Sequence, residues 1–311
     1  MKFLNKILIA TDYSRSVYNA ERYAVALAKK TGAELIFLHI YNPPIIPLQS
    51  SLPLNHIDKN FHEQKMRLLN QHLDEMSSAL RIKQDNFQII SVTAQGTDPA
   101  KEILLTAKNL NPDLLIIGTH GKTGYKKNTF GSVTWKVIRE AHNPVLVVPE
   151  DALFTGWNRM AYASANQRSE VAAISFLSSM AKKFNSEIKI VHITKAKQDY
   201  GIEQKLTGDF AKEILKQISW KKITQHAVAA EDIIKGLNKF ILENEVDLLV
   251  LSPEKKNVFE KVFKESVRRR MSFHTRVPLL CLPDYSESEN NGFWKLTGLT
   301  DKGILNDLFL A

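Results

Sequence analysis

Three glycines and a serine in the N-terminal half have the spacing of a phosphate-binding loop. Gly118 and Gly121 are followed, after nine further residues, by Gly131 and Ser132. Glycine lets backbone N–H groups approach an oxyanion closely, because it carries no side chain. Gly131 and Ser132 also open a predicted helix over 132–141, and a helix N-terminus favours negative charge. The pattern therefore predicts a site for a phosphorylated ligand.

A carboxylate follows the first predicted strand of the same half. Asp12 comes two residues after the end of the apolar stretch 6–10, in the run Ala10-Thr11-Asp12. In dinucleotide-binding folds an acidic residue near a strand end accepts hydrogen bonds from ribose hydroxyls. Asp12 is therefore the residue that we expect to contact a ribose.

Two catalytic motifs are suggested by short stretches of the sequence, and neither is complete. The segment 121–123 resembles the end of a P-loop, but Ile116 stands where the first glycine of that motif belongs. His62-Glu63 resembles the start of a zinc-protease motif, but Met66 stands where the second histidine belongs. The histidines show no other metal-ligand spacing, and no Ser-His-Asp assignment can be argued from the sequence.

The chain of 311 residues contains an internal duplication. Residues 7–40, moved forward by 153 positions, fall on residues 160–193 without a gap. Near the end of each half the displacement is 134 positions, so the second copy is shorter in its middle. Because each copy has the length of a domain, we expect two tandem domains rather than a solenoid. They are residues 1–150 and 151–285, followed by a C-terminal tail of residues 286–311.

Within the first copy, short apolar runs alternate with segments of helical periodicity. Continuous apolar strands between helices indicate a parallel sheet that is covered on both faces. Right-handed crossovers cover both faces only if the strand order reverses, and ligands bind at that reversal. The predicted fold class is α/β, with two tandem open five-stranded parallel-sheet domains and helices on both faces. The predicted strands of the first copy are 6–10, 34–40, 87–94, 114–117 and 145–148.

The glycine pattern resembles the ATP-binding signature of the universal stress protein family. The resemblance extends to Ala10-Thr11-Asp12 after strand one, to His39-Ile40 in strand two, and to the closing segment 143–149. These elements frame essentially all of residues 5–150. The resemblance implies the adenine nucleotide alpha hydrolase-like fold, and ATP as the ligand, with or without Mg²⁺.

The resemblance also implies which residues touch the nucleotide. Asp12 would contact the ribose, and the backbone of Ile40 would contact the adenine. Gly118, His120 and Gly121 would line the ribose and phosphates, although His120 as a packing residue remains an alternative. The triphosphate would be held at the start of the helix. The full implied set is Ala10, Thr11, Asp12, Ile40, Gly118, His120, Gly121, Gly131, Ser132 and Val133.

The second copy has lost most of this pattern. In the repeat register Ala165 replaces Asp12, and within the glycine-serine pattern only Ser132 keeps its residue type, as Ser266. The side chains that replace the glycines would occupy the space that a phosphate needs, and the carboxylate of Glu265 would repel an anion. We therefore expect a degenerate domain without a nucleotide. The three glycines become Ser252, Lys255 and Glu265.

Composition narrows the class of partner and the compartment. The net charge of +9 is spread over both halves, so it is only weak evidence for a nucleic-acid partner.

No apolar run approaches the roughly 20 residues that span a bilayer, and we expect no signal peptide. A single cysteine, Cys281, excludes an internal disulfide, suits the reducing cytoplasm, and is expected to be a buried packing residue. The apolar tail is expected to dock on this chain or on a symmetry mate, with partner recruitment as the alternative.

The resemblance implies a regulatory protein in the stress response, in which ATP occupancy sets conformation or partners. In this family, domains commonly pair through their fifth strands, which implies an internal pseudo-dimer of the two halves and leaves a homodimer open. An enzymatic alternative is slow ATP hydrolysis or nucleotidyl transfer, although no catalytic base is evident near the phosphates. A third alternative is a scaffold for an anionic lipid or polymer.

Overall fold

A computed structural model describes residues 4–43, 54–82, 87–119, 131–166, 170–194, 218, 220–252 and 277–283, with only the backbone of 54–57. The chain forms two compact units that divide between Phe154 and Thr155. The predicted site residues His120 and Gly121 and the tail lie outside the described residues. So do the second-copy positions 255, 265 and 266.

The N-terminal unit contains a five-stranded sheet in which all strands run parallel. Its strand order is β3-β2-β1-β4-β5, so the order reverses between β1 and β4. This confirms the α/β fold class expected from the sequence. The elements are β1 (Lys6–Thr11), α1 (Arg15–Thr31), β2 (Glu34–Tyr41), α2 (Leu54–Ala79), β3 (Ile89–Gln95), α3 (Pro99–Leu110), β4 (Leu114–Gly118), α4 (Ser132–Glu140) and β5 (Val145–Val148).

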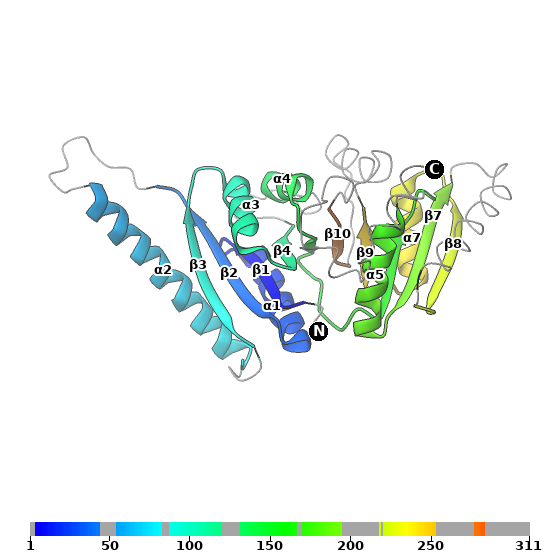
Figure 1. Cartoon of the computed structure of the whole chain (residues 1–311), viewed down its shortest axis with the longest axis horizontal. Coiled ribbons are helices and arrows are strands. Elements are labelled where there is room, and N and C mark those ends of the chain that lie inside the picture. Colours follow the sequence, from blue (N-terminus) through cyan, green and yellow to red (C-terminus); the bar gives the residue numbers. More distant parts are fainter. Residues whose placement is uncertain are drawn as a thin grey trace, which may run out of the picture. The chain divides into compact units, whose positions relative to one another are not determined.

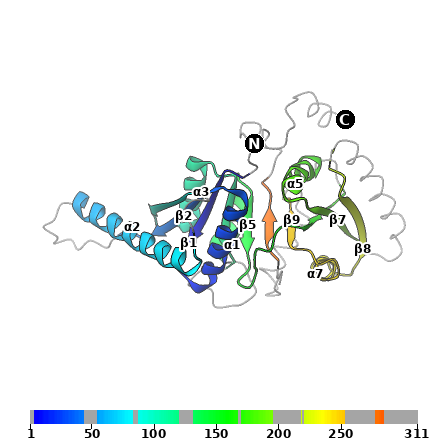
Figure 2. The same cartoon turned by 90° about the horizontal axis from the view of Figure 1, so that it is seen from below.

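Two pairs of helices cover opposite faces of this sheet. Helix α1 packs on β1 and β4, and α2 packs along β3 on the same face. Helices α3 and α4 pack on each other and on the other face, as Figure 1 and Figure 2 show. The central strands are consequently buried on both sides: Leu8 and Ile9, successive residues of β1 whose side chains point to opposite faces, have no exposed surface. Burial on both sides is the reason why these strands are continuous apolar runs.

Local sequence signals set several helix ends. Asp98 caps α3, where its side chain accepts a hydrogen bond from the Lys101 amide, and Pro99 occupies the first turn. Gly32 ends α1 in a left-handed conformation with φ of 70°, which a residue without Cβ adopts at little cost. Helix α2 begins at Leu54, earlier than the apolar periodicity from Met66 onward indicates. The apolar periodicity does not extend to its early turns, because residues 58–60 are exposed and need not be apolar.

The C-terminal unit has the same strand order, β10-β9-β6-β7-β8, and its strands also run parallel. In the described residues no helix is both long and apolar enough to cross a bilayer. Cys281 is buried in its last strand, as expected for a packing residue. The elements are β6 (Arg159–Ala163), α5 (Val171–Phe184), β7 (Glu187–Thr194), β8 (Ile223–Ala229), α7 (Ile233–Glu243), β9 (Leu248–Leu251) and β10 (Leu279–Cys281).

The two units repeat each other down to the strand register. Lys6 pairs with Glu34 in the first unit, and the residues 153 positions later, Arg159 and Glu187, pair in the second. The same polar contact recurs where the first strand of each unit begins. Asp113 accepts hydrogen bonds from the Asn5 and Lys6 amides, and Asp247 accepts them from the Asn158 and Arg159 amides. The two units therefore share this strand register and this polar contact.

Candidate functional site

The candidate site lies at the carboxyl ends of β1, β2 and β4, where the strand order reverses. Ala10 and Thr11 end β1, Ile40 lies near the end of β2, and Gly118 ends β4. Because parallel strands present their carboxyl ends at one edge, these four residues come from distant parts of the sequence to that edge. Ala10, Thr11 and Gly118 are buried. Asp12, Ile40, Gly131 and Val133 are half-buried, and Ser132 is exposed.

The start of α4 is held against the end of β4. The Gly131 amide donates a hydrogen bond to the Thr119 carbonyl oxygen at 2.8 Å. The buried Thr134 hydroxyl donates to the Gly118 carbonyl oxygen at 2.9 Å. Gly131 is the N-cap and offers no side-chain cap to the amides of the first turn. The helix N-terminus, with Ser132 exposed, therefore opens at the edge where the strand order reverses.

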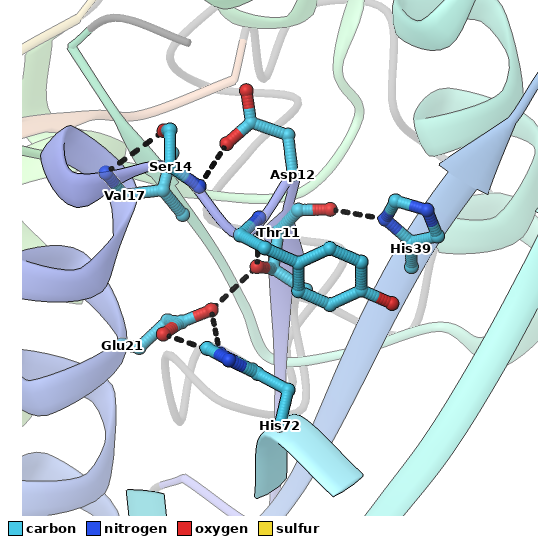
Figure 3. Close-up of polar contacts among 8 residues, drawn as sticks. Thr11, Asp12, Ser14, Val17, Glu21, His39 and His72 are labelled. Atoms are coloured by element: carbon cyan, nitrogen blue, oxygen red, sulfur yellow. Dashed lines mark hydrogen bonds and ion pairs between the residues drawn. The ribbon is translucent and has the colours of Figure 1, made fainter. Parts of the chain in front are cut away.

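Asp12 lies on the side of β1 that faces away from α1. The side chain of its neighbour Thr11 is hydrogen-bonded to Glu21 on α1, and successive side chains of a strand point to opposite faces. Figure 3 shows the Asp12 carboxylate pointing away from Glu21 and His72. One of its oxygens accepts a hydrogen bond from the Ser14 amide at 2.9 Å. Ile40 follows His39, the register partner of Thr11, and so belongs to the same face as Asp12.

A polar cluster behind this loop was not predicted from the sequence. Thr11 Oγ1 donates to Glu21 Oε1 at 2.5 Å, and His72 Nε2 lies 2.9 and 3.0 Å from the two Glu21 oxygens (Figure 3). Glu21 has no exposed surface. Its available signal was a carboxylate on the apolar stripe of α1, four residues after the buried Val17. His72 gave no signal, because it is 51 residues away in the sequence.

Tyr13 completes the cluster. Its backbone is left-handed, with φ of 60°, a conformation that costs a non-glycine residue about 1 kcal/mol. Its amide donates to Thr11 Oγ1 at 3.1 Å, and its ring stacks on His39 with centroids 4.3 Å apart. The His39 Nδ1 atom lies 3.0 Å from the Thr11 carbonyl oxygen. Burial, and then the charge of Glu21, raises the pKa of Tyr13, so its hydroxyl stays neutral.

The C-terminal unit fills the equivalent edge with its own carboxylate. Ser164 corresponds to Thr11, and His192 Nδ1 lies 2.9 Å from its carbonyl oxygen. Glu170, which is 6% exposed, accepts hydrogen bonds from Ser164 Oγ at 2.5 Å and from the Ala165 amide at 2.7 Å. Ala165 occupies the position of Asp12. Ser252, at the position of Gly118, has a buried hydroxyl that makes no hydrogen bond within the part of the chain that the structure describes.

No group of three or more His, Cys, Asp or Glu side chains among the described residues is placed to hold a metal ion.

The predicted site residues that the structure brings to this edge are those at the strand ends and those at the start of α4. Sequence reasoning missed Glu21, His72 and Tyr13.

Comparisons with known proteins identify relatives of the N-terminal unit. The model of the universal stress protein family matches residues 4–149. Universal stress protein YxiE of Bacillus subtilis is 31% identical over 146 residues, which are 46% of this chain and 98% of the relative. Universal stress protein MJ0531 of Methanocaldococcus jannaschii is 32% identical over 144 residues, 46% of this chain and 81% of the relative.

The fold extends over both units. The crystal structure of a universal stress protein from Archaeoglobus fulgidus covers 90% of this chain and 98% of its own, with a TM-score of 0.63 and 17% sequence identity. The similarity of the second half is therefore one of fold.

Proposed function

Because the chain belongs to the universal stress protein family, we propose that it binds ATP at the carboxyl edge of the N-terminal sheet. One observation carries the proposal: the N-terminus of α4 opens beside the end of β4, tied there by the bond from the Gly131 amide to Thr119. Unpaired amides at a helix start attract anions, and the macrodipole adds to this attraction. The edge also offers the Asp12 carboxylate, which is a hydrogen-bond acceptor for a ribose.

In the proposed complex the phosphates contact the start of α4 and the glycines of its preceding loop. Gly131, Ser132 and Val133 hold the triphosphate, while Gly118, His120 and Gly121 line the ribose and phosphates. Asp12 accepts from the ribose hydroxyls, and the Ile40 backbone contacts the adenine beside Ala10 and Thr11. A Mg²⁺ ion, where present, would be held chiefly by phosphate oxygens, which such ions favour.

We propose that the C-terminal unit binds no nucleotide. The amide of Ala165, at the position of Asp12, is already paired with the buried carboxylate of Glu170. A second anion there would lie against that carboxylate in a poorly solvated place, which is unfavourable. The loss of all three glycines in the repeat register supports the same conclusion.

The proposed role is regulatory: ATP occupancy of one unit sets the conformation or the partners of a cytoplasmic stress protein. In this proposal residues 1–150 carry the nucleotide site and residues 151–285 do not. An internal pseudo-dimer of the two halves, or a homodimer, would give occupancy a surface on which to act. No observation among the described residues favours the enzymatic or the anionic-scaffold alternative.

Isothermal titration of the full chain with ATP tests the proposal. We expect one ATP per chain, and no binding after Gly131→Trp. Gly131 has φ of −63° and ψ of 156°, which any residue adopts, so the substitution changes the space and not the backbone. The matched control is Glu265→Trp at the repeat position, which should leave binding unchanged. Two ATP per chain, or binding that survives Gly131→Trp, would contradict the proposal.

The same samples separate binding from catalysis. Under the proposal, any hydrolysis of ATP incubated with the chain proceeds at the same rate in the wild type and in Ser132→Ala. Turnover that vanishes in Ser132→Ala would instead favour an enzyme. Strongly salt-dependent binding of an anionic polymer that survives Gly131→Trp would favour a scaffold.

A further inference from the structure

The 11–14 loop runs from Thr11, the last residue of β1, to Ser14, the N-cap of α1, and carries Asp12. We propose that Glu21 and His72 are positioning residues that latch this loop in its binding geometry, and that the latch loosens when His72 loses its proton. The effect on nucleotide affinity rests on the proposed function. The latching of the loop does not, because it concerns contacts within the protein.

The latch joins three elements through one carboxylate. Glu21 comes from α1, and its two oxygens meet Thr11 Oγ1 and His72 Nε2 within 3.0 Å. Glu21 is fully buried, and a buried carboxylate is unfavourable unless it is paired and hydrogen-bonded. Removing either partner therefore leaves the buried Glu21 carboxylate short of hydrogen bonds, which favours its displacement. A displaced Glu21 no longer holds Thr11 in place.

Thr11 is held at both its hydroxyl and its carbonyl group. The hydroxyl donates to Glu21 and accepts from the Tyr13 amide at 3.1 Å. The carbonyl oxygen lies 3.0 Å from His39 Nδ1. Asp12 is the next residue, and its side chain points to the opposite face of β1 (Figure 3). A displacement of Thr11 therefore moves Asp12 on the side where the nucleotide is proposed to bind.

The backbone conformation of Tyr13 makes the loop depend on the contacts that hold Thr11. A non-glycine residue in a left-handed conformation persists only where its surroundings impose it. These surroundings include the bond of its amide to Thr11, the ring of His39, and the ring of His72 with a centroid 5.0 Å away. Two of these three contacts depend on the latch. Loosening it allows the loop to relax toward a conformation that the Tyr13 backbone favours.

The charge of His72 decides how strongly the latch holds. The groups that face it are Glu21 from α1, Tyr13 from the loop and Glu75 from its own helix, with His39 beyond the Tyr13 ring. The hydrogen bond to Glu21, despite opposing burial, raises the pKa of His72 above its ordinary value of 6.5. The contribution of the pair is therefore complete below pH 6.5 and is lost as the pH rises through the raised value. Neutral His72 keeps one N–H but no charge.

The test compares the full-length protein with two variants by amide exchange at Tyr13 and Ser14, from pH 6 to 8.5, without nucleotide. In His72→Gln the side chain can still donate to Glu21, but it cannot titrate. Asp74→Asn is the control, because it removes one exposed charge from α2 that is not among the groups acting on His72. After division by the intrinsic exchange rate, we expect the wild-type rates to rise about ten-fold and those of His72→Gln to stay flat. The control should follow the wild type.

Titration with ATP over the same pH range completes the test. We expect the wild-type Kd to rise by about ten-fold and the Kd of His72→Gln to stay constant once the titration of ATP itself is subtracted. Flat wild-type exchange, or equal pH dependence in His72→Gln, would overturn the latch. Exchange that changes while the Kd does not would overturn its coupling to the site. Wild-type protein that binds no ATP at any pH would instead refute the proposed function, and the exchange rates would still decide the latch.

Discussion

The Thr134 hydroxyl donates a hydrogen bond to the Gly118 carbonyl oxygen at 2.9 Å, and this contact ties α4 to the end of β4. Both residues are buried, so the bond is shielded from water. It places the helix N-terminus at the carboxyl edge of the sheet. The position of the proposed phosphate site therefore depends on a residue that the proposed nucleotide does not contact.

Thr134→Val should weaken ATP binding without abolishing it. The variant keeps the shape of the side chain but leaves the Gly118 carbonyl oxygen without this donor, which costs about 1–3 kcal/mol of stability. We expect the Kd for ATP to rise by several-fold, because the start of α4 is held less firmly. Thr31→Val, which removes a similar hydroxyl bond at the end of α1, is the matched control and should leave the Kd unchanged. Equal Kd values for all three proteins would contradict this role of Thr134.

Glu170→Gln should destabilise the C-terminal unit without creating a nucleotide site. The carboxylate satisfies the Ser164 hydroxyl and the Ala165 amide, and hydrogen bonds to a charged group are worth about 1.5–3 kcal/mol each. We expect a lower midpoint of urea unfolding and a stoichiometry that remains one ATP per chain. A second ATP in this variant would show that Glu170 alone keeps the site closed, contrary to the argument from the lost glycines.

Asp247 should make the stability of the C-terminal unit depend on pH. Burial raises the pKa of Asp247 above its ordinary value of 3.8, although the amides of Arg159 and Asn158 oppose the shift. In the folded state the group therefore binds a proton more readily than in the unfolded state. Its contribution to stability is complete below pH 3.8 and is lost as the pH rises through the raised value.

Urea unfolding of Asp247→Asn between pH 3.5 and 7 measures this contribution. Relative to the wild type, the variant should gain stability as the pH rises, because asparagine keeps an acceptor oxygen without a buried charge. Asp113→Asn, at the matching position of the N-terminal unit, controls for the loss of the carboxylate at a strand start. A constant difference between wild type and Asp247→Asn at every pH would contradict the prediction.

Local signals in the sequence determined the elements and the fold class. The alternation of apolar runs with helical periodicity indicated five parallel strands per unit. A strand that is buried on both faces is apolar at nearly every position, and such a run is visible in the sequence. Capping residues such as Asp98 and Gly32 indicated helix ends for the same reason: their effect depends on neighbouring residues. The two displacements of the repeat, 153 and 134, reappear as equal strand registers in both units.

Only the tertiary structure showed what holds the 11–14 loop. Glu21 meets Thr11 across 10 positions of the sequence and His72 across 51, and no periodicity records a contact over such separations. The two units also differ at this point, since the second uses Glu170 where the first uses Glu21. Side chains one turn apart on a helix can reach the same strand end, so the sequence alone does not say which carboxylate arrives there. Chain folding decides it, because it sets the distance between α1, α2 and the end of β1.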